Sequence, residues 1–241
     1  MIDLYTIRID AEQASTLNGW LMEYVSEQKK LSANRFKKAI DAHRTIIGEL
    51  IARIAICRRL EVANHALAFG RNAHNKPFLV HPPGYHYNIS HAGDWVVCAF
   101  GNGPVGIDVE FMKPMDLDIA GRFFSAQEVE RLNRLEESEQ LAYFYRIWTL
   151  KESYVKAVGK GLSMPLDSFS VRLEGKAYGR PSLEAGEPHA YFRQFVLDER
   201  HVMALCTFSE ETIELHRLDY EGLIGHLPLL EGNGSRASRQ S

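Results

Sequence analysis

The chain has 241 residues, of which 45% are apolar and 24% are charged, a composition typical of a globular protein with one large domain or two compact halves. Its formal net charge of -3 argues against general nucleic-acid binding, which needs a basic surface. Every apolar stretch is shorter than the about 18 residues that suggest a membrane helix, so we expect a cytoplasmic protein with no membrane partner.

The first half of the sequence predicts helices followed by short strands. Residues 5–9 alternate as in a strand, and Asp10 with Gln13 predicts the capped start of a helix. Apolar residues then recur at helical spacing over residues 17–25 and 47–54. Glycine and proline separate the strand-like runs that follow, which are residues 66–69, 77–80, 85–90, 95–100 and 105–111.

The second half repeats this arrangement after a polar, proline-containing stretch at residues 113–118. Ser125 and Glu128 form a capping box, and a long helix is expected from about residue 138 to 158, closed by Gly159 and Gly161. Strands are expected at residues 169–173, 190–196, 202–208 and 213–218. We therefore predict an α+β fold with two helix-on-sheet halves, residues 1–112 and 113–230, and a disordered tail at residues 231–241.

Two carboxylates in the strand predicted at residues 105–111 share one face. Val105, Ile107 and Val109 occupy one side of this strand, so Asp108 and Glu110 project together from the other. Side by side they repel each other, which is tolerable if the face is solvated or if a hard divalent cation such as Mg²⁺ bridges them. Both interpretations, an acidic outer face and a metal site, stay open on this segment alone.

The long predicted helix places a third carboxylate, Glu152, within an apolar stripe. The stripe consists of Leu141, Phe144, Tyr145, Trp148 and Val155. An unpaired buried charge is costly, so Glu152 is expected to meet a metal, a proton or a cation, and Lys156 at i+4 is the better local partner. The alternative is a plain surface pair of Glu152 with Lys156. Together with Asp108 and Glu110, Glu152 would form a three-oxygen site for Mg²⁺, with Mn²⁺ as an alternative ion.

Basic residues are then expected along a path for substrate phosphates. The candidates stand next to predicted element edges or loops and are Lys29, Lys30, Arg44, Lys76, His91, Lys151 and Lys156. Taken one at a time, each is more often a solvated surface charge. His91 is the more specific candidate because it ends a strand directly after the hydroxyl of Ser90.

Several sequence blocks follow one another in the order and spacing of a known family. They are Asn88-Ile89-Ser90-His91 with Trp95, Gly106-Ile107-Asp108-Val109-Glu110, Phe123-Phe124-Ser125, and Trp148-Thr149-Leu150-Lys151-Glu152-Ser153-Tyr154-Val155-Lys156 with Gly159-Lys160-Gly161-Leu162. Further matches bring the covered span to residues 29–173. The chain thereby resembles the Sfp-type (surfactin-synthetase-activating type) 4′-phosphopantetheinyl transferases.

The resemblance implies a fold and a reaction. The fold is a pseudo-dimer of two similar α+β halves, with the nucleotide of coenzyme A on the first half and the metal helix and carrier docking, near residues 159–166, on the second. The reaction is the Mg²⁺-dependent transfer of 4′-phosphopantetheine from coenzyme A to a serine of an apo acyl or peptidyl carrier protein, which releases adenosine 3′,5′-bisphosphate.

The resemblance also implies residue roles. Asp108, Glu110 and Glu152 resemble the Mg²⁺ ligands, and Asp108, Glu152 and Lys156 are the expected catalytic residues, with Glu152 as our hypothesis for the general base. The residues expected to hold coenzyme A are Lys29, Arg44, Thr45, Lys76, Ser90, His91, Lys151 and Lys156. Relatives often carry a basic residue at the position of Ser32 and a glycine at that of Asn75, so we expect the grip on the 3′-phosphate to differ here.

Other partners and rival functions follow from the same features. We expect a monomer, because an internally duplicated chain needs no second copy to complete its cleft. The family leans towards carriers of secondary metabolism. One alternative is a metal-dependent nuclease, which the negative net charge disfavours. The other is a non-catalytic carrier-binding module, which the three carboxylates with Lys156 disfavour. Cys57, Cys98 and Cys206 are expected to be buried thiols in a reducing compartment.

Overall fold

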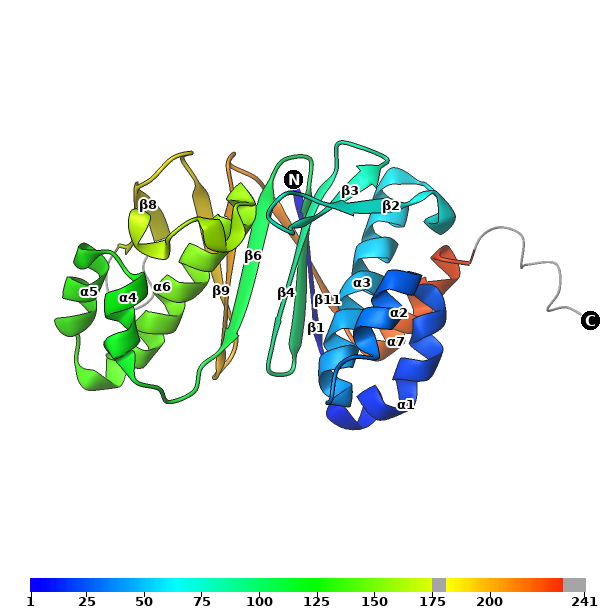
Figure 1. The fold of residues 1–241 in the computed structure, drawn as a ribbon, viewed down its shortest axis with the longest axis horizontal. Coiled ribbons are helices and arrows are strands. Elements are labelled where there is room, and N and C mark those ends of the chain that lie inside the picture. Colours follow the sequence, from blue (N-terminus) through cyan, green and yellow to red (C-terminus); the bar gives the residue numbers. More distant parts are fainter. Residues whose placement is uncertain (175–180, 232–241) are drawn as a thin grey trace, which may run out of the picture.

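Two β-sheets stand side by side, and each sheet has its own long helix packed on one face (Figure 1). The computed structural model describes residues 1–174 and 181–231, apart from the side chains of residues 15 and 162. The predicted disordered tail therefore lies outside the described residues, except for residue 231. Within these ranges, no helix combines the length and the apolar character that crossing a membrane requires.

The first sheet has the strand order β11-β1-β5-β4. Its strands are β1 (Ile2–Arg8), β4 (His86–Ala92), β5 (Trp95–Gly101) and β11 (Ile213–Leu218). The helices of this half are α1 (Ala11–Leu21), α2 (Glu27–Ala33), α3 (Ala39–Leu60) and α7 (Tyr220–His226). The long helix α3 packs against β4 and β5. A separate hairpin consists of β2 (Ala68–Arg71) and β3 (Pro77–His81).

The second sheet has the strand order β6-β10-β9-β8-β7. Its strands are β6 (Val105–Phe111), β7 (Ser170–Leu173), β8 (Pro181–Ala185), β9 (Tyr191–Asp198) and β10 (His201–Thr207). Its helices are α4 (Ala120–Phe123), α5 (Ala126–Asn133) and the long α6 (Glu137–Val158), which packs on β6 and β10. Short 3-10 turns are η1 (Met22–Tyr24), η2 (Asn64–Ala66), η3 (Leu117–Ile119), η4 (Gly161–Ser163), η5 (Leu166–Ser168) and η6 (Leu227–Leu229).

The α+β class with two helix-on-sheet halves is confirmed, but the sheets do not divide at residue 112. Strand β6 precedes that position and pairs with β10, whereas β11 follows it and runs parallel to β1. Figure 1 shows β11 and α7 beside the first half. Alternating apolar residues identify a strand but not its neighbour, so the sequence could not reveal this exchange. The functional division into residues 1–112 and 113–230 stays a prediction.

Three apolar clusters form the core, one within each half and one between the two sheets. One packs α3 on the first sheet, a second packs α6 on the second sheet, and a third joins the sheets to each other. Ile2 and Leu4 of β1, Ile107 of β6 and Met203 of β10 belong to this third cluster, and none is more than 2% exposed. Burying each such side chain stabilises the fold by about 1.5–3 kcal/mol, so the sheets are held in one relative placement.

Local sequence signals set the ends of α5 and α6. Ser125 and Glu128 form the predicted capping box, in which the backbone N–H of Ser125 donates to Glu128 Oε2 at 2.7 Å. Helix α6 ends at Gly159, whose φ of 81° lies in the left-handed region that glycine enters without strain. The end of α6 is thus fixed by the residue that the sequence indicated.

Side chains of β4 join the two sheets along the edge of β6. The backbone N–H of Ile107 donates to Asn88 Oδ1 at 2.8 Å, and that of Val109 donates to Ser90 Oγ at 3.3 Å. These bonds satisfy groups of an edge strand that would otherwise lack partners. They also fix Ser90 of the first sheet beside Asp108 of the second sheet, in the centre of the molecule where β4 and β6 run side by side (Figure 1).

Candidate active site

A cavity of about 370 Å³ opens where β4, β6 and α6 meet. Its lining consists of Ile89, Ser90, His91, Asp108, Val109, Glu110, Trp148, Glu152 and Lys156. All three predicted metal ligands, all three predicted catalytic residues and two further predicted contacts of coenzyme A therefore border one space.

A glycine lets α6 approach β6 closely enough to build this cavity. A Cβ added at Gly106 would lie 2.0 Å from the carbonyl oxygen of Ser153 and 2.4 Å from the backbone nitrogen of Ala157. Any larger residue would have to push the helix backbone away. Because α6 rests directly on β6, the side chains of Glu152 and Lys156 reach the same space as Asp108.

Asp108 binds two groups through one oxygen and none through the other. Lys156 Nζ donates to its Oδ1 at 2.6 Å, and Ser90 Oγ donates to the same atom at 3.0 Å. Its Oδ2 is buried and has no hydrogen-bond partner among the described residues. Burial raises the pKa of Asp108, while Lys156 and Ser90 oppose that rise. A buried carboxylate oxygen without a partner is a position where a ligand is expected.

The two other carboxylates add negative charge to the same space. Burial, followed by repulsion from Asp108, raises the pKa of Glu110 to about 7, although Lys156 and the Trp148 side chain oppose that rise. Burial and the charge of Asp108 likewise raise the pKa of Glu152. The carboxylates disfavour one another's ionised form, and a bound cation would relieve that repulsion.

The donor set fits a hard divalent cation, although the three carboxylates do not converge on one point. In the described part of the chain, the only three His, Cys, Asp or Glu ligand atoms within 4.8 Å of one another belong to Asp3, Glu214 and His216. These three residues lie on β1 and β11. Strand β5 separates β1 from β4 in the first sheet, and none of the three residues lines the cavity. In the cavity, the ammonium of Lys156 occupies Oδ1 of Asp108, but Oδ2 remains available as an oxygen donor.

The structure contradicts the prediction that Lys151 contacts coenzyme A. Its side chain is fully buried on another side of α6, where Nζ donates to Glu128 Oε1 and to the carbonyl oxygen of Phe169, both at 2.7 Å. Five residues along an α-helix correspond to a rotation of about 140°, so Lys151 and Lys156 cannot face the same cavity. Lys151 is a buried structural cation.

Lys76 is also absent from the cavity lining. Its Nζ donates to backbone carbonyl oxygens of Val105 and Ala157, each at 3.3 Å, and to that of Lys156. An ammonium group has three donor hydrogens, and all three have acceptors here. The Lys76 side chain thus lies on the end of α6 and the start of β6, and its contact with the nucleotide stays a prediction.

The remaining predicted contacts of coenzyme A lie on the first half. Arg44 of α3 donates through Nε to the carbonyl oxygen of Gly93 at 2.9 Å and pairs with Asp41. His91 is exposed as a whole residue, and partial burial of its ring, followed by the charges of Arg44 and Lys156, lowers its pKa. Lys29 on α2 lies 3.9 Å from Glu49, and Thr45 is half-buried on α3. Neither lines the cavity.

Some residues of the site had no predicted role. Asn88 holds the edge of β6, Gly106 sets the approach of α6, and Trp148 lines the cavity together with Glu110. A glycine inside a strand pattern is a signal of close backbone approach and could have identified Gly106. The sequence carried no comparable signal for the place of Trp148 in the cavity lining.

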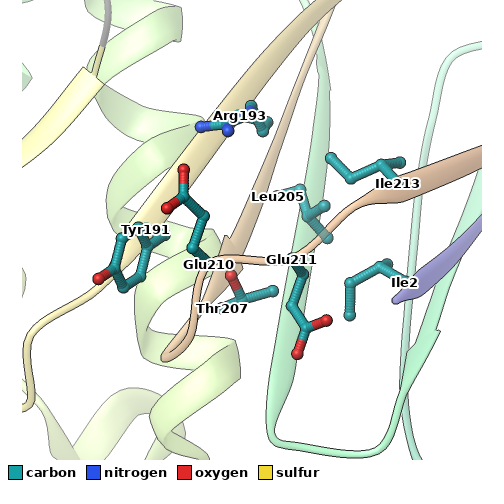
Figure 2. Close-up of a pocket in the computed structure, with 8 residues that line it drawn as sticks. All are labelled: Ile2, Tyr191, Arg193, Leu205, Thr207, Glu210, Glu211 and Ile213. Carbon is teal, nitrogen blue, oxygen red and sulfur yellow. The ribbon is translucent and has the colours of Figure 1, made fainter.

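A second recess is too small to hold a substrate. It lies between β1, β9, β10 and β11, and Figure 2 shows Glu210 and Glu211 on the segment that leads into β11. Its volume of about 10 Å³ suits a single water molecule. Of the predicted site residues, none lines it.

The chain is similar to known proteins over most of its length. Residues 104–206 match the family described as the 4′-phosphopantetheinyl transferase superfamily, and residues 15–102 match 4′-phosphopantetheinyl transferase, N-terminal. The chain is 38% identical to 4′-phosphopantetheinyl transferase Sfp of Bacillus subtilis (strain 168), over 92% of this chain and 99% of that protein. It is 37% identical to 4′-phosphopantetheinyl transferase gsp of Aneurinibacillus migulanus, over 70% of each.

A solved structure of holo-[acyl-carrier-protein] synthase from Thermotoga maritima aligns with 43% of this chain and 61% of that chain. The two are 23% identical, and the TM-score is 0.36.

Proposed function

The chain belongs to the Sfp-type 4′-phosphopantetheinyl transferases, and on that premise we propose that it moves the 4′-phosphopantetheine arm of coenzyme A onto a serine of an apo acyl or peptidyl carrier protein. The observation that carries this proposal is the cavity in which Asp108, Glu110, Glu152 and Lys156 meet. These residues lie in the sequence blocks that resemble the family.

The three carboxylates are the proposed ligands of Mg²⁺, or of Mn²⁺ in its place. Oxygen donors suit such hard cations, and the unpartnered Oδ2 of Asp108 supports the assignment. When bound, the ion would neutralise the diphosphate and stabilise charge on the leaving phosphate. Glu110 and Glu152 border the same space and complete the proposed ligand set.

Lys156 is the proposed cationic contact of the diphosphate. Its Nζ donates to Asp108 Oδ1 and to Ser90 Oγ, which leaves one of its three donor hydrogens for a phosphate oxygen. Asp108 and Ser90 keep the ammonium at the cavity wall before the substrate arrives. A cation fixed in this way stabilises developing negative charge without reorganising during the reaction.

Glu152 is the proposed general base. The hydroxyl oxygen of the carrier serine attacks the β-phosphorus, its proton passes to the Glu152 carboxylate, and the bond between the β-phosphorus and the bridging oxygen breaks. Adenosine 3′,5′-bisphosphate then leaves. Its place in the cavity lining beside Asp108 and Glu110 supports this role, because a carboxylate there can face the incoming hydroxyl. Near-normal turnover of Glu152→Gln at saturating Mg²⁺ would contradict it.

We place the 3′-phosphoadenosine part of coenzyme A on the first half. His91 lines the cavity, and the charge of Arg44 helps to lower the pKa of His91. Lys29 of α2 and Thr45 of α3 remain proposed contacts.

The carrier protein is proposed to dock near residues 159–166. Met164 packs partly into the second apolar cluster, and the side chain of Leu162 lies outside the described residues.

The proposed setting is the cytoplasm, with the chain acting as a monomer. Cys57, Cys98 and Cys206 are free and buried, as suits a reducing compartment. A single chain supplies both walls of the cavity, so no second copy is needed to complete it.

Mass spectrometry tests the function directly. An apo carrier protein incubated with the chain, coenzyme A and Mg²⁺ should gain the mass of one phosphopantetheine, and a chelator should prevent the gain. An unmodified carrier under both conditions would favour a non-catalytic carrier-binding module. Nicking of plasmid DNA with Mg²⁺ would instead favour a metal-dependent nuclease.

A further inference from the structure

The hairpin of β2 and β3 reaches across to the end of α6. Asn72 Nδ2 donates to the carbonyl oxygen of Gly159 at 2.9 Å, and His74 Nδ1 forms a 3.1 Å hydrogen bond with Ser163 Oγ. Lys76, on the same loop, binds the last turn of the helix through Nζ. Residues 72–76 of the first half therefore dock onto the helix that carries Glu152 and Lys156.

This loop is ordered by its own hydrogen bonds. Asn72 Oδ1 accepts from the backbone N–H groups of His74 and Lys76, both at 2.9 Å, and Asn75 adopts a left-handed φ of 67°. Arg71 Nη1 donates to the carbonyl oxygen of Asn75 at 2.9 Å. Lys76 is thus presented to α6 by a loop that is already shaped.

The position of the Lys76 ammonium matches the chemistry of a helix end. The last carbonyl groups of an α-helix lack partners within the helix and carry partial negative charge. Lys76 supplies donors to two of them, on Lys156 and Ala157. Burial lowers the pKa of Lys76 to about 8, and among the described residues no carboxylate pairs with it. The ammonium is therefore held by backbone carbonyl groups.

The same ammonium links the two elements that build the cavity. Its third acceptor is the carbonyl oxygen of Val105, the first residue of β6, and Asp108 stands three residues further along that strand. Its contact on α6 is the backbone of Lys156, whose side chain binds Asp108. A single group thus ties the start of β6 to the end of α6, close to where Gly106 lets them touch.

We propose that Lys76 is a positioning residue that fixes the end of α6 on β6 and thereby holds Lys156 against Asp108. The proposal rests on the proposed function only for its effect on turnover. It differs from a nucleotide-binding role because the three donors of Lys76 are already used on carbonyl oxygens.

Two matched variants separate these roles. Lys76→Met removes the donors, and Arg59→Met removes an exposed cation from the last turn of the other long helix, α3. We expect Lys76→Met to lower kcat about 10- to 100-fold while the Kd for adenosine 3′,5′-bisphosphate changes less than about twofold, because a misplaced catalytic group slows chemistry more than binding. Arg59→Met should change neither value. If Lys76→Met does not fold, Lys76→Gln retains an amide donor and replaces it.

A loss of affinity for adenosine 3′,5′-bisphosphate of about tenfold or more, with kcat retained, would assign Lys76 to the phosphate and overturn the proposal. A second readout does not need turnover. Amide hydrogen exchange in residues 155–161 should become faster in Lys76→Met and stay unchanged in Arg59→Met. Unchanged exchange in Lys76→Met would also overturn the proposal. If the wild-type chain transfers nothing to a carrier, the proposed function fails, but the exchange result still decides the role of Lys76.

Discussion

Two lysines on α6 each bind a carboxylate, and their surroundings differ. Lys151 and Glu128 are both 0% exposed, and the remaining bonds of Glu128 are made with the backbone N–H groups of Ser125 and Val171. Lys156 and Asp108 border an open cavity, the Lys156 side chain is 28% exposed, and Oδ2 of Asp108 has no partner among the described residues. The same chemical pair is complete on one side of the helix and incomplete on the other.

This difference separates a structural pair from a functional one. A buried ion pair whose every oxygen is satisfied has no capacity left for a ligand, so its removal should affect folding. A pair with an unpartnered oxygen and a spare donor can accept a metal or a phosphate, so its removal should affect chemistry. Variants of the two pairs should therefore separate a loss of folding from a loss of chemistry.

The largest expected effect is on stability. Lys151→Met leaves Glu128 buried without its cation, and we expect the free energy of unfolding to fall by about 3–5 kcal/mol. Urea unfolding followed by circular dichroism measures this. The double variant Lys151→Met with Glu128→Gln should recover part of the loss. If Lys151→Met were as stable as the wild type, Lys151 would not have the structural role assigned to it.

The matching change on the cavity side is Lys156→Met. We expect transfer to a carrier protein to slow by about 100-fold or more, because a fixed cation at the diphosphate is lost. The free energy of unfolding should change by less than about 2 kcal/mol, since Asp108 can take up a proton or contact water in the cavity. If Lys156→Met unfolded readily yet turned over normally, the pair of Lys156 and Asp108 would be structural and not functional.

Gly106→Ala tests whether the close approach of α6 to β6 is needed to form the cavity that Asp108 and Lys156 border. The added Cβ would meet backbone atoms of Ser153 and Ala157, so we expect a loss of about 1–3 kcal/mol in the free energy of unfolding. Turnover per folded molecule should also fall. Gly103→Ala is the control, because a Cβ there has nothing within 4 Å. Equal behaviour of the two variants would rule out this role for Gly106.

The smallest effect concerns His43, a satisfied buried group of the first half. Its Nδ1–H donates to Asn18 Oδ1 at 2.6 Å, its Nε2 accepts from Tyr220 Oη at 2.7 Å, and burial lowers its pKa from 6.5 to about 4. The unfolded chain therefore takes up a proton first as the pH falls, and stability decreases between pH 6.5 and about 4. We expect a loss of about 1–2 kcal/mol at pH 5 that His43→Gln does not show. Equal pH dependence of both proteins in urea unfolding would contradict this assignment.

The sequence predicted the residues that regular elements place and missed those that long side chains place. Alternation in β6 and the period of α6 are local properties, so the meeting of Asp108, Glu110 and Glu152 at one cavity could be expected. The ends of Lys76 and Lys151 depend on which carbonyl groups or carboxylates pack nearby, which local spacing does not determine. The exchange of β6 and β11 between the sheets was unpredictable for the same reason.

The proposed function depends most on Asp108, whose Oδ2 has no hydrogen-bond partner among the described residues. The most direct test is the rate of phosphopantetheine transfer to an apo carrier, followed by mass spectrometry, for the wild type and Asp108→Asn across a Mg²⁺ titration. We predict that the wild type is activated by Mg²⁺ and that Asp108→Asn remains about 100- to 1000-fold slower at every Mg²⁺ concentration while folding normally. Wild-type transfer by Asp108→Asn at ordinary Mg²⁺ would contradict the account.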